Sequence, residues 1–254
     1  LSVASGPGTF TNSSTLSVNA ANGIATFSNL VLNTAGSYTF AASNPSFTSA
    51  PSAAVTIKPA AATHLSIQQQ PGTGSAGVAL APAVKVAVED QYGNVVTANS
   101  TVTLTLKSGK FSNGATSASA TASSGVATFS NLILNVVGTY TLTATDGAYT
   151  PTALSVTIAP AAAKKLVFLQ TPPTSGTAGV TLSPAVTVAV EDSFGNLETS
   201  DSSTVTLTLS SGTFANGSKT ATATAAYGIA TFSGLVINKA ATYTITASDG
   251  TLTT

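Results

Sequence analysis

The chain has 254 residues, of which 43% are hydrophobic and only 6% are charged, and its formal net charge is zero. The 8 cationic residues are all lysines and are scattered singly apart from Lys164 and Lys165, so no basic stripe is present to neutralise the phosphates of a nucleic acid. Cysteine is absent, which excludes disulfides and thiolate metal sites and fits an exported bacterial protein, and the chain shows neither a signal peptide nor an apolar run that would span a bilayer.

One segment recurs almost unchanged in each third of the chain. GIATFSNLVLN from Gly23 returns as GVATFSNLILN from Gly125 and as GIATFSGLVIN from Gly228, at successive spacings of 102 and 103 residues. Self-similarity at this period indicates tandem domains that are each large enough to have a core. Both ends of the chain fall inside a repeat, and we expect the array to continue past them. The predicted units are the C-terminal part of a repeat (1–59), a complete repeat (60–160), and a repeat that lacks its last strand (161–254).

Apolar and polar residues alternate with period two along most of the chain, whereas helical periodicity is almost absent. Val102, Leu104 and Leu106 alternate with Thr103 and Thr105, which predicts a half-buried strand with its threonines outward. Turn-forming Gly, Asn, Asp and Pro separate such runs, as in an all-β sandwich. In chain order, the complete repeat is expected to form strands at 65–69, 78–80, 84–89, 102–106, 117–122, 126–130, 139–145 and 154–158.

The stretch GVATFSNLILNVVGTYTLTAT is typical of strands E and F of an immunoglobulin fold. Tyr140 lies two residues before Leu142, in the place where antibody domains carry their second cysteine, and Tyr38 and Tyr243 take the same place in the other copies. This pattern predicts a tyrosine corner, in which the phenol binds the backbone a few residues upstream. The cysteines and the central tryptophan of antibody domains are missing, so disulfide-free bacterial domains are the better comparison.

Two hairpin sequences carry a family resemblance together with the Gly-x-Tyr-Thr strands. They read VAVEDQYGN at 86–94 and VAVEDSFGN at 188–196. In these motifs the chain resembles the bacterial immunoglobulin-like repeats of large surface adhesins of the invasin and intimin type. The resemblance implies tandem immunoglobulin-like β-sandwiches in an elongated array, and an extracellular or cell-surface location. Such motifs mark a fold and not a binding partner.

Recurrence between copies tests whether a residue has a role in every repeat. The single histidine, His64, becomes Lys165 in the next copy, so we interpret it as a surface residue at the junction between repeats. Without a recurring histidine, a Ser-His pair or a His-metal site is excluded. The lysines do not recur either, which argues against a lysine–asparagine isopeptide cross-link in every repeat. We therefore expect that the protein is not an enzyme.

The acidic residues do recur. The structural interpretation is that Asp90 makes an Asx-type bond into the hairpin ending at Gly93 and Asn94, and that Asp146 begins an Asp-Gly turn. The alternative is a calcium site, because Ca²⁺ takes six to eight oxygen ligands. No cofactor is expected, and a pair of carboxylates acting on a glycoside lacks an aromatic platform for the sugar. The candidate calcium ligands are Glu89, Asp90, Asp146, Glu191, Asp192 and Asp249.

Neutral hydroxyl side chains dominate the outward positions of the strands. Charged residues that normally keep edge strands apart are scarce. We therefore expect these faces to be covered, either by neighbouring copies in a filament or surface layer or by glycans. Asn12, Asn99 and Asn216 begin Asn-x-Ser/Thr sequons, although such matches are common by chance in a chain this rich in Ser and Thr.

The links between the repeats read IKPAAATHL from Ile57 and IAPAAAKKL from Ile158, a proline followed by alanines, which favours an extended rod. The predicted function is structural: the repeat region of a large extracellular bacterial surface protein, acting as a stalk or filament subunit. The alternative is an adhesin module that binds a glycan or protein through the repeats. The near-identity of the copies favours the stalk.

Overall fold

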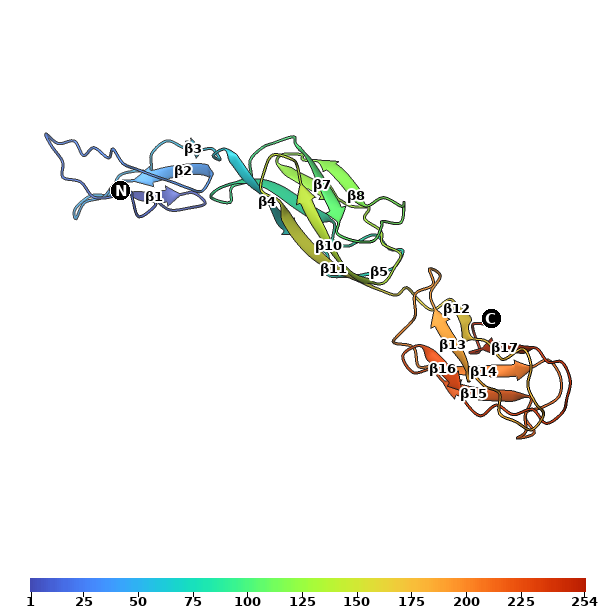
Figure 1. Ribbon diagram of the computed structural model, residues 1–254. Helices are drawn as coiled ribbons and strands as arrows, with labels where there is room; N and C mark the ends of the chain where they lie inside the picture. Colours follow the sequence, from blue (N-terminus) through green and yellow to red (C-terminus); the bar gives the residue numbers. More distant parts are fainter.

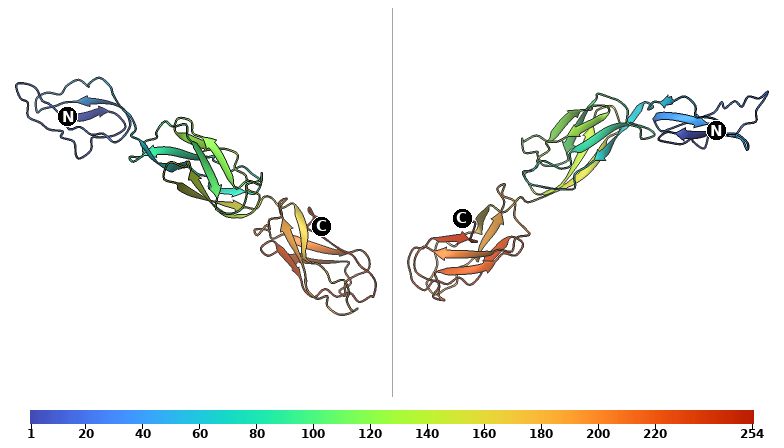
Figure 2. Two further views of the ribbon diagram at one scale, coloured as in Figure 1. Left: turned by 45° about the horizontal axis from the view of Figure 1, so that its top comes forward. Right: turned by 180° about the vertical axis from the view of Figure 1, so that it is seen from behind.

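The computed structural model describes all 254 residues as three β units in an extended row (Figure 1). Views from two other sides show the same elongated arrangement (Figure 2). The chain forms 17 strands and no helix, which confirms the all-β prediction. We refer to the three units as the first, second and third repeats.

The second repeat is the most complete. Apart from one short strand, its strands lie where the alternation of apolar and hydroxyl residues predicted them. Its eight strands are β4 (Ala62–Gln69), β5 (Thr73–Ser75), β6 (Val84–Asp90), β7 (Thr101–Leu106), β8 (Ser117–Thr121), β9 (Val126–Phe129), β10 (Gly138–Thr145) and β11 (Thr152–Ala159).

These strands form two sheets that face each other. One has the order β4-β6-β9 and the other the order β5-β11-β10-β7-β8, and every pairing is antiparallel except that of β5 with β11. In immunoglobulin letters these orders are A-B-E and A′-G-F-C-C′. The fold is therefore an immunoglobulin-like sandwich in which the edge strand β8 pairs with β7.

The core of the second repeat lies between the two sheets. Val84, Val86 and Val88 project from β6 with no exposed surface, and Leu104 and Leu142 of the opposing sheet are equally buried. The core contains 21 buried residues in the second repeat and 13 in the third. Alternate residues of a strand point to opposite faces, so the same strands place their threonines outward.

One expected strand is wrong in position. The sequence predicted a short strand at 78–80, but the short strand is β5 (Thr73–Ser75), which runs parallel to β11. Ala79 makes only an isolated bridge to Ile133. A three-residue strand at a sheet edge buries too few side chains to produce an alternating pattern, so its position depends on β11.

The first and third repeats contain subsets of the same strands. The first has a single sheet, β1-β2-β3, and Tyr38 is its only buried residue. The third has the sheets β12-β13-β16 and β15-β14-β17. The strands are β1 (Ser2–Ser5), β2 (Gly36–Ala41) and β3 (Val55–Ile57), then β12 (Lys165–Gln170), β13 (Val186–Glu191), β14 (Thr204–Leu209), β15 (Thr220–Thr224), β16 (Ile229–Phe232) and β17 (Ile245–Ser248).

All three repeats form the predicted tyrosine corner. The hydroxyl of Tyr140 donates to the carbonyl of Val136 at 2.9 Å. In the first repeat the Tyr38 hydroxyl binds the carbonyl of Thr34 at 2.7 Å, and in the third the Tyr243 hydroxyl binds that of Lys239 at 2.8 Å. Each phenol reaches the residue four positions upstream, and that residue lies at a bend of the chain in all three repeats.

Candidate functional site

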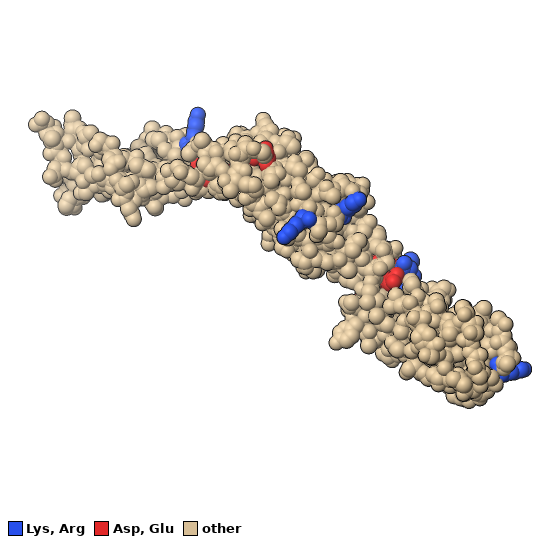
Figure 3. Space-filling model, in the orientation of Figure 1, with Lys and Arg blue, Asp and Glu red and all other residues tan.

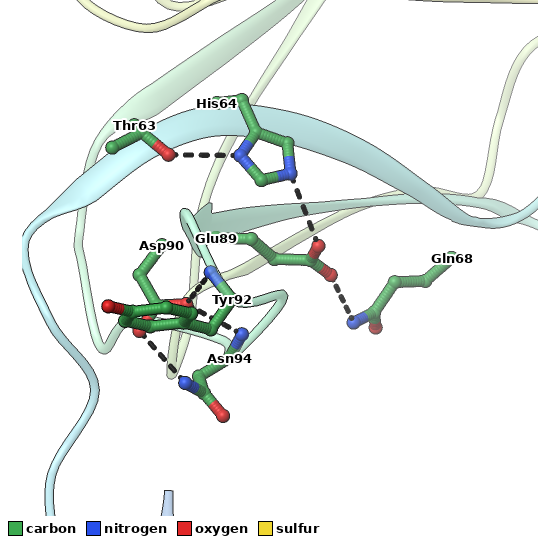
Figure 4. Close-up of polar contacts among 7 residues, drawn as sticks. All are labelled: Thr63, His64, Gln68, Glu89, Asp90, Tyr92 and Asn94. Carbon is green, nitrogen blue, oxygen red and sulfur yellow. Dashed lines mark hydrogen bonds and ion pairs between the residues drawn. The ribbon is translucent and has the colours of Figure 1, made fainter. Parts of the chain in front are cut away.

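The recurring Glu-Asp hairpins lie at the two junctions between repeats. We call residues Asp90–Asn94 and Asp192–Asn196 the junction hairpins. In the first, Oδ1 of Asp90 accepts the N–H groups of Tyr92 (2.8 Å) and Asn94 (2.9 Å) (Figure 4). Gly93 has φ +80°, a left-handed conformation that glycine adopts without strain. The Asx-type turn predicted for Asp90 is confirmed.

The second carboxylate oxygen of Asp90 fixes the link between repeats. Oδ2 accepts the side-chain Nδ2–H of Asn94 (2.9 Å) and the backbone N–H of Ala60 (2.8 Å), which lies in the Pro-Ala-Ala linker. Asp192 makes the equivalent bonds to Asn196 (2.7 Å) and Ala161 (3.0 Å). Each aspartate therefore orients its own hairpin and the linker that leads into its repeat.

Burial and hydrogen bonding act in opposite directions on these carboxyls. Burial raises the pKa of Asp90, but N–H donors from the side chain and backbone of Asn94, from Ala60 and from Tyr92 outweigh it and lower the pKa from 3.8 to about 2. The pKa of Asp192 is lowered by the same balance. Asp90, Asp192 and Asn196 are the only buried polar or charged residues in the chain. A buried charge is tolerated where hydrogen bonds compensate for lost water, as they do here.

Each junction asparagine crosses into the preceding repeat. Nδ2 of Asn94 donates to the carbonyl of Asn33 (2.7 Å), and Oδ1 accepts the N–H of Ala35 (2.8 Å). Asn196 makes the same two bonds, to the carbonyl of Asn135 (2.8 Å) and from the N–H of Val137 (3.1 Å). Each junction thus has the same six hydrogen bonds, four to an aspartate and two across the repeat boundary.

This role of the asparagines was not predicted from the sequence, which indicated only a turn. Their recurrence at Asn94 and Asn196 is a signal that could have pointed to it. A turn that needs only a left-handed residue is satisfied by the preceding glycine, so a recurring asparagine calls for a further reason. The partner groups are backbone atoms of Asn33, Ala35, Asn135 and Val137, which no side-chain pattern reveals.

An aromatic residue of the hairpin also crosses the second junction. Phe194 lies against Gly77 of the second repeat, and a methyl group on Gly77 would overlap its ring. Tyr92 has the corresponding place in the first junction hairpin. The third repeat carries the corresponding glycine, Gly179, and no ring lies on it.

A basic residue lies against the recurring glutamate beside each hairpin. Nε2 of His64 lies 3.6 Å from Oε2 of Glu89, and Gln68 donates to the other oxygen of Glu89 at 3.4 Å (Figure 4). In the third repeat, Nζ of Lys165 lies 3.2 Å from Oε2 of Glu191. The prediction that His64 is simply a surface residue is thus incomplete, because it is half-buried and pairs with the recurring glutamate.

The remaining calcium candidates lie in separate turns. Oδ1 of Asp146 accepts the N–H groups of Ala148 (3.0 Å) and Tyr149 (2.9 Å), the turn that the sequence predicted. Oδ1 of Asp249 accepts the N–H groups of Thr251 and Leu252 and the Thr251 hydroxyl. No group of three or more His, Cys, Asp or Glu side chains is placed to hold a metal ion.

Charged groups are few on the rest of the surface (Figure 3). Charged side chains are scattered on a largely neutral surface (Figure 3). The third repeat has an open hollow of about 430 Å³, which is bordered by Pro172–Ala178 and Lys239–Tyr243 and carries Lys239 as its single charge. Its Pro172–Ala178 border corresponds to the segment of the second repeat that contains β5, and its Lys239–Tyr243 border corresponds to the tyrosine corner at Val136–Tyr140. No helix is present that would cross a membrane.

Comparison with known proteins gives structural matches alone. No protein-family model and no curated protein matches the chain. Among solved structures, it is similar to invasin, a bacterial integrin-binding protein (15% identity, TM-score 0.36, 74% of this chain and 36% of invasin), so it spans about a third of that protein. It is also similar to the Escherichia coli adhesin FdeC, with 18% identity and a TM-score of 0.42 over 85% of this chain and 70% of FdeC. The match to Yersinia pseudotuberculosis InvD has 16% identity and a TM-score of 0.40 over 96% of this chain and 83% of InvD. Bacterial β-glucuronidases match as well, at a TM-score of 0.25.

Proposed function

We propose that this chain is a structural repeat region of a large extracellular bacterial surface protein, and that it acts as a stalk which holds its repeats in a fixed orientation. The observation that carries the proposal is that both junctions contain the same six hydrogen bonds. A flexible linker would need no buried aspartate and no asparagine that reaches into the preceding repeat.

The extracellular location is part of the proposal. The chain has no cysteine, its outer faces are rich in hydroxyl groups, and its hairpin motifs resemble those of bacterial immunoglobulin-like repeats. No constellation of nucleophile, base and acid accompanies the buried aspartates, whose oxygens accept N–H groups of the protein itself. A role in holding the repeats together explains why these aspartates are buried and hydrogen-bonded, whereas a catalytic role does not explain it.

Small-angle scattering combined with a distance measurement across the second junction tests the proposal. Because the chain has no cysteine, spin labels attach only at introduced cysteines. Thr128→Cys and Thr231→Cys place labels at matching exposed positions of β9 and β16. We expect an elongated particle and a single narrow distance distribution between the labels. A compact or variable particle with a broad distribution contradicts the stalk.

Binding through the repeats is the competing function. A glycan or protein ligand of the repeats would bind the isolated chain in solution, whereas a stalk needs no ligand. Screening the labelled chain against host-cell surfaces and glycan arrays separates the two functions, because reproducible saturable binding favours the adhesin module.

A further inference from the structure

The two backbone groups that receive each junction asparagine flank the residue that binds the corner tyrosine. Tyr140 binds the carbonyl of Val136, and Asn196 binds the carbonyl of Asn135 and the N–H of Val137. The first junction repeats this relation. Tyr38 binds the carbonyl of Thr34, and Asn94 binds the neighbouring residues on each side.

Backbone geometry explains why these three contacts go together. Val136 lies at a bend just before β10, as Thr34 does before β2, and its own carbonyl is occupied by the tyrosine hydroxyl. The preceding carbonyl and the following N–H are the groups that bind the side-chain amide of the next repeat. When the Tyr140 hydroxyl holds the Val136 carbonyl, the groups of Asn135 and Val137 are left for the asparagine of the next repeat. Their spacing then matches the donor and acceptor of one side-chain amide.

We propose that the corner tyrosine is a positioning residue for the junction, beyond its part in the fold of its own repeat. It presents the backbone of the corner to the asparagine of the next repeat. The partner it serves is therefore a hairpin of the form Asp-x-aromatic-Gly-Asn. This inference rests on the proposed stalk function, because it assigns the group that sets the orientation of that junction.

The third repeat provides a matched corner without a docked hairpin. Tyr243 binds the carbonyl of Lys239 in the same way, but the carbonyl of Asn238 and the N–H of Ala240 form no hydrogen bond in the chain. Removing the hydroxyl from Tyr140 or from Tyr243 therefore deletes the same bond within a repeat. Only the change at Tyr140 acts on a corner that receives an asparagine.

The experiment compares Tyr140→Phe with Tyr243→Phe in the full chain that carries the labels at 128 and 231. We expect Tyr140→Phe to lose the single narrow distance peak and Tyr243→Phe to keep it, while thermal melts show similar destabilisation of the two repeats. In hydrogen exchange, Tyr140→Phe should also speed exchange of the Val137 amide by about fivefold to tenfold, the equivalent of a net hydrogen bond of about 1 kcal/mol.

Each outcome has a definite meaning. A narrow peak in the unmodified chain and in both variants overturns the positioning role, and so does equal broadening in both variants, because that reflects general loss of stability. A broad distribution already in the unmodified chain overturns the stalk itself. If Tyr140→Phe does not fold, Tyr38→Phe gives the same test at the first junction, where faster exchange of the Ala35 amide is expected and unchanged exchange contradicts the proposal.

Discussion

Phe194, from the third repeat, lies against Gly77 of the second repeat so closely that no side chain fits between them. Gly77 has φ +76° and its N–H donates to the carbonyl of Leu134 at 2.9 Å. The glycine therefore serves two purposes, a left-handed turn and a flat surface for the ring. Phe194 and Asn196 of the same hairpin contact the second repeat at separate points. A substitution at either contact should therefore change the orientation of the third repeat relative to the second.

Gly77→Ala should disturb the orientation of the second and third repeats. Gly179→Ala is the matched control, since Gly179 has φ +78° and the nearest atom to an added methyl group is Oδ1 of Asn238 at 4.0 Å. Both variants should lose about 1–2 kcal/mol of repeat stability because a left-handed conformation is strained for alanine. Only Gly77→Ala should broaden the distance distribution between labels at 128 and 231. Equal distributions for the two variants contradict the packing role of Phe194.

Asn196→Ala should loosen the second junction. It removes two hydrogen bonds across the boundary, each of net value about 0.5–1.5 kcal/mol, and one donor to Asp192. Asn216→Ala is the control in the same repeat, because Oδ1 of Asn216 accepts only the N–H of Ser218 within its own loop. We expect the label distances to spread in Asn196→Ala alone. An unchanged distance distribution in Asn196→Ala contradicts the prediction, because the linker and the Phe194 ring would then hold the orientation of the repeats without the asparagine.

Acid should weaken the first junction through Asp90. Its folded-state pKa of about 2 lies below the ordinary 3.8, so the unfolded chain binds the proton first. The stabilisation is complete above about pH 4 and is lost as the pH falls through the folded-state pKa of about 2. The free energy of unfolding of the full chain, measured by denaturation between pH 5 and about pH 2, should fall with the pH. In Asp90→Asn this free energy should depend less steeply on pH. Identical slopes in the two proteins contradict the role assigned to the carboxylate.

Calcium should leave stability unchanged. The oxygens of Asp90 and of Asp192 accept N–H donors of the protein, and a ligand stabilises only by binding the folded state preferentially. Thermal melts of the full chain with calcium and with a chelator should coincide. A clear upward shift with calcium supports a site at Glu89, Asp90 and Asp146 or at their counterparts Glu191, Asp192 and Asp249.

The hydroxyl-rich edges should be covered in material from the natural source. β8 pairs only with β7, and β15 pairs only with β14, and neither SASAT nor TATAT carries a charge to prevent edge pairing. We expect lateral packing of copies or glycans on Ser, Thr or Asn. Native mass measurement and solution scattering of that material provide the test. An unmodified monomer that stays dispersed at high concentration contradicts both forms of the prediction.

The sequence alone determined the features that depend on local pattern. The alternation around Val102 and Leu104 predicted β7, because a strand that is buried on one face requires a period of two. The recurrence of Asp90 with its following Gly and Asn predicted the Asx turn, and the place of Tyr140 predicted the tyrosine corner. In the Asx turn and the tyrosine corner the bonding groups lie within four residues of one another, and the strand pattern is contained in a single six-residue segment.

Tertiary structure alone decided what the hairpins do at the junction. Asn94 binds the backbone of Asn33 and Ala35, about sixty residues away, and the sequence contains no complementary side chain that would have pointed to this contact. The position of β5 was likewise decided by its pairing with β11. Nearly every residue carries the same backbone donor and acceptor. A contact with backbone groups therefore requires no particular side chain in the segment that receives it, and the sequence of that segment does not reveal it. It becomes visible only when folding brings the corner of one repeat to the hairpin of the next.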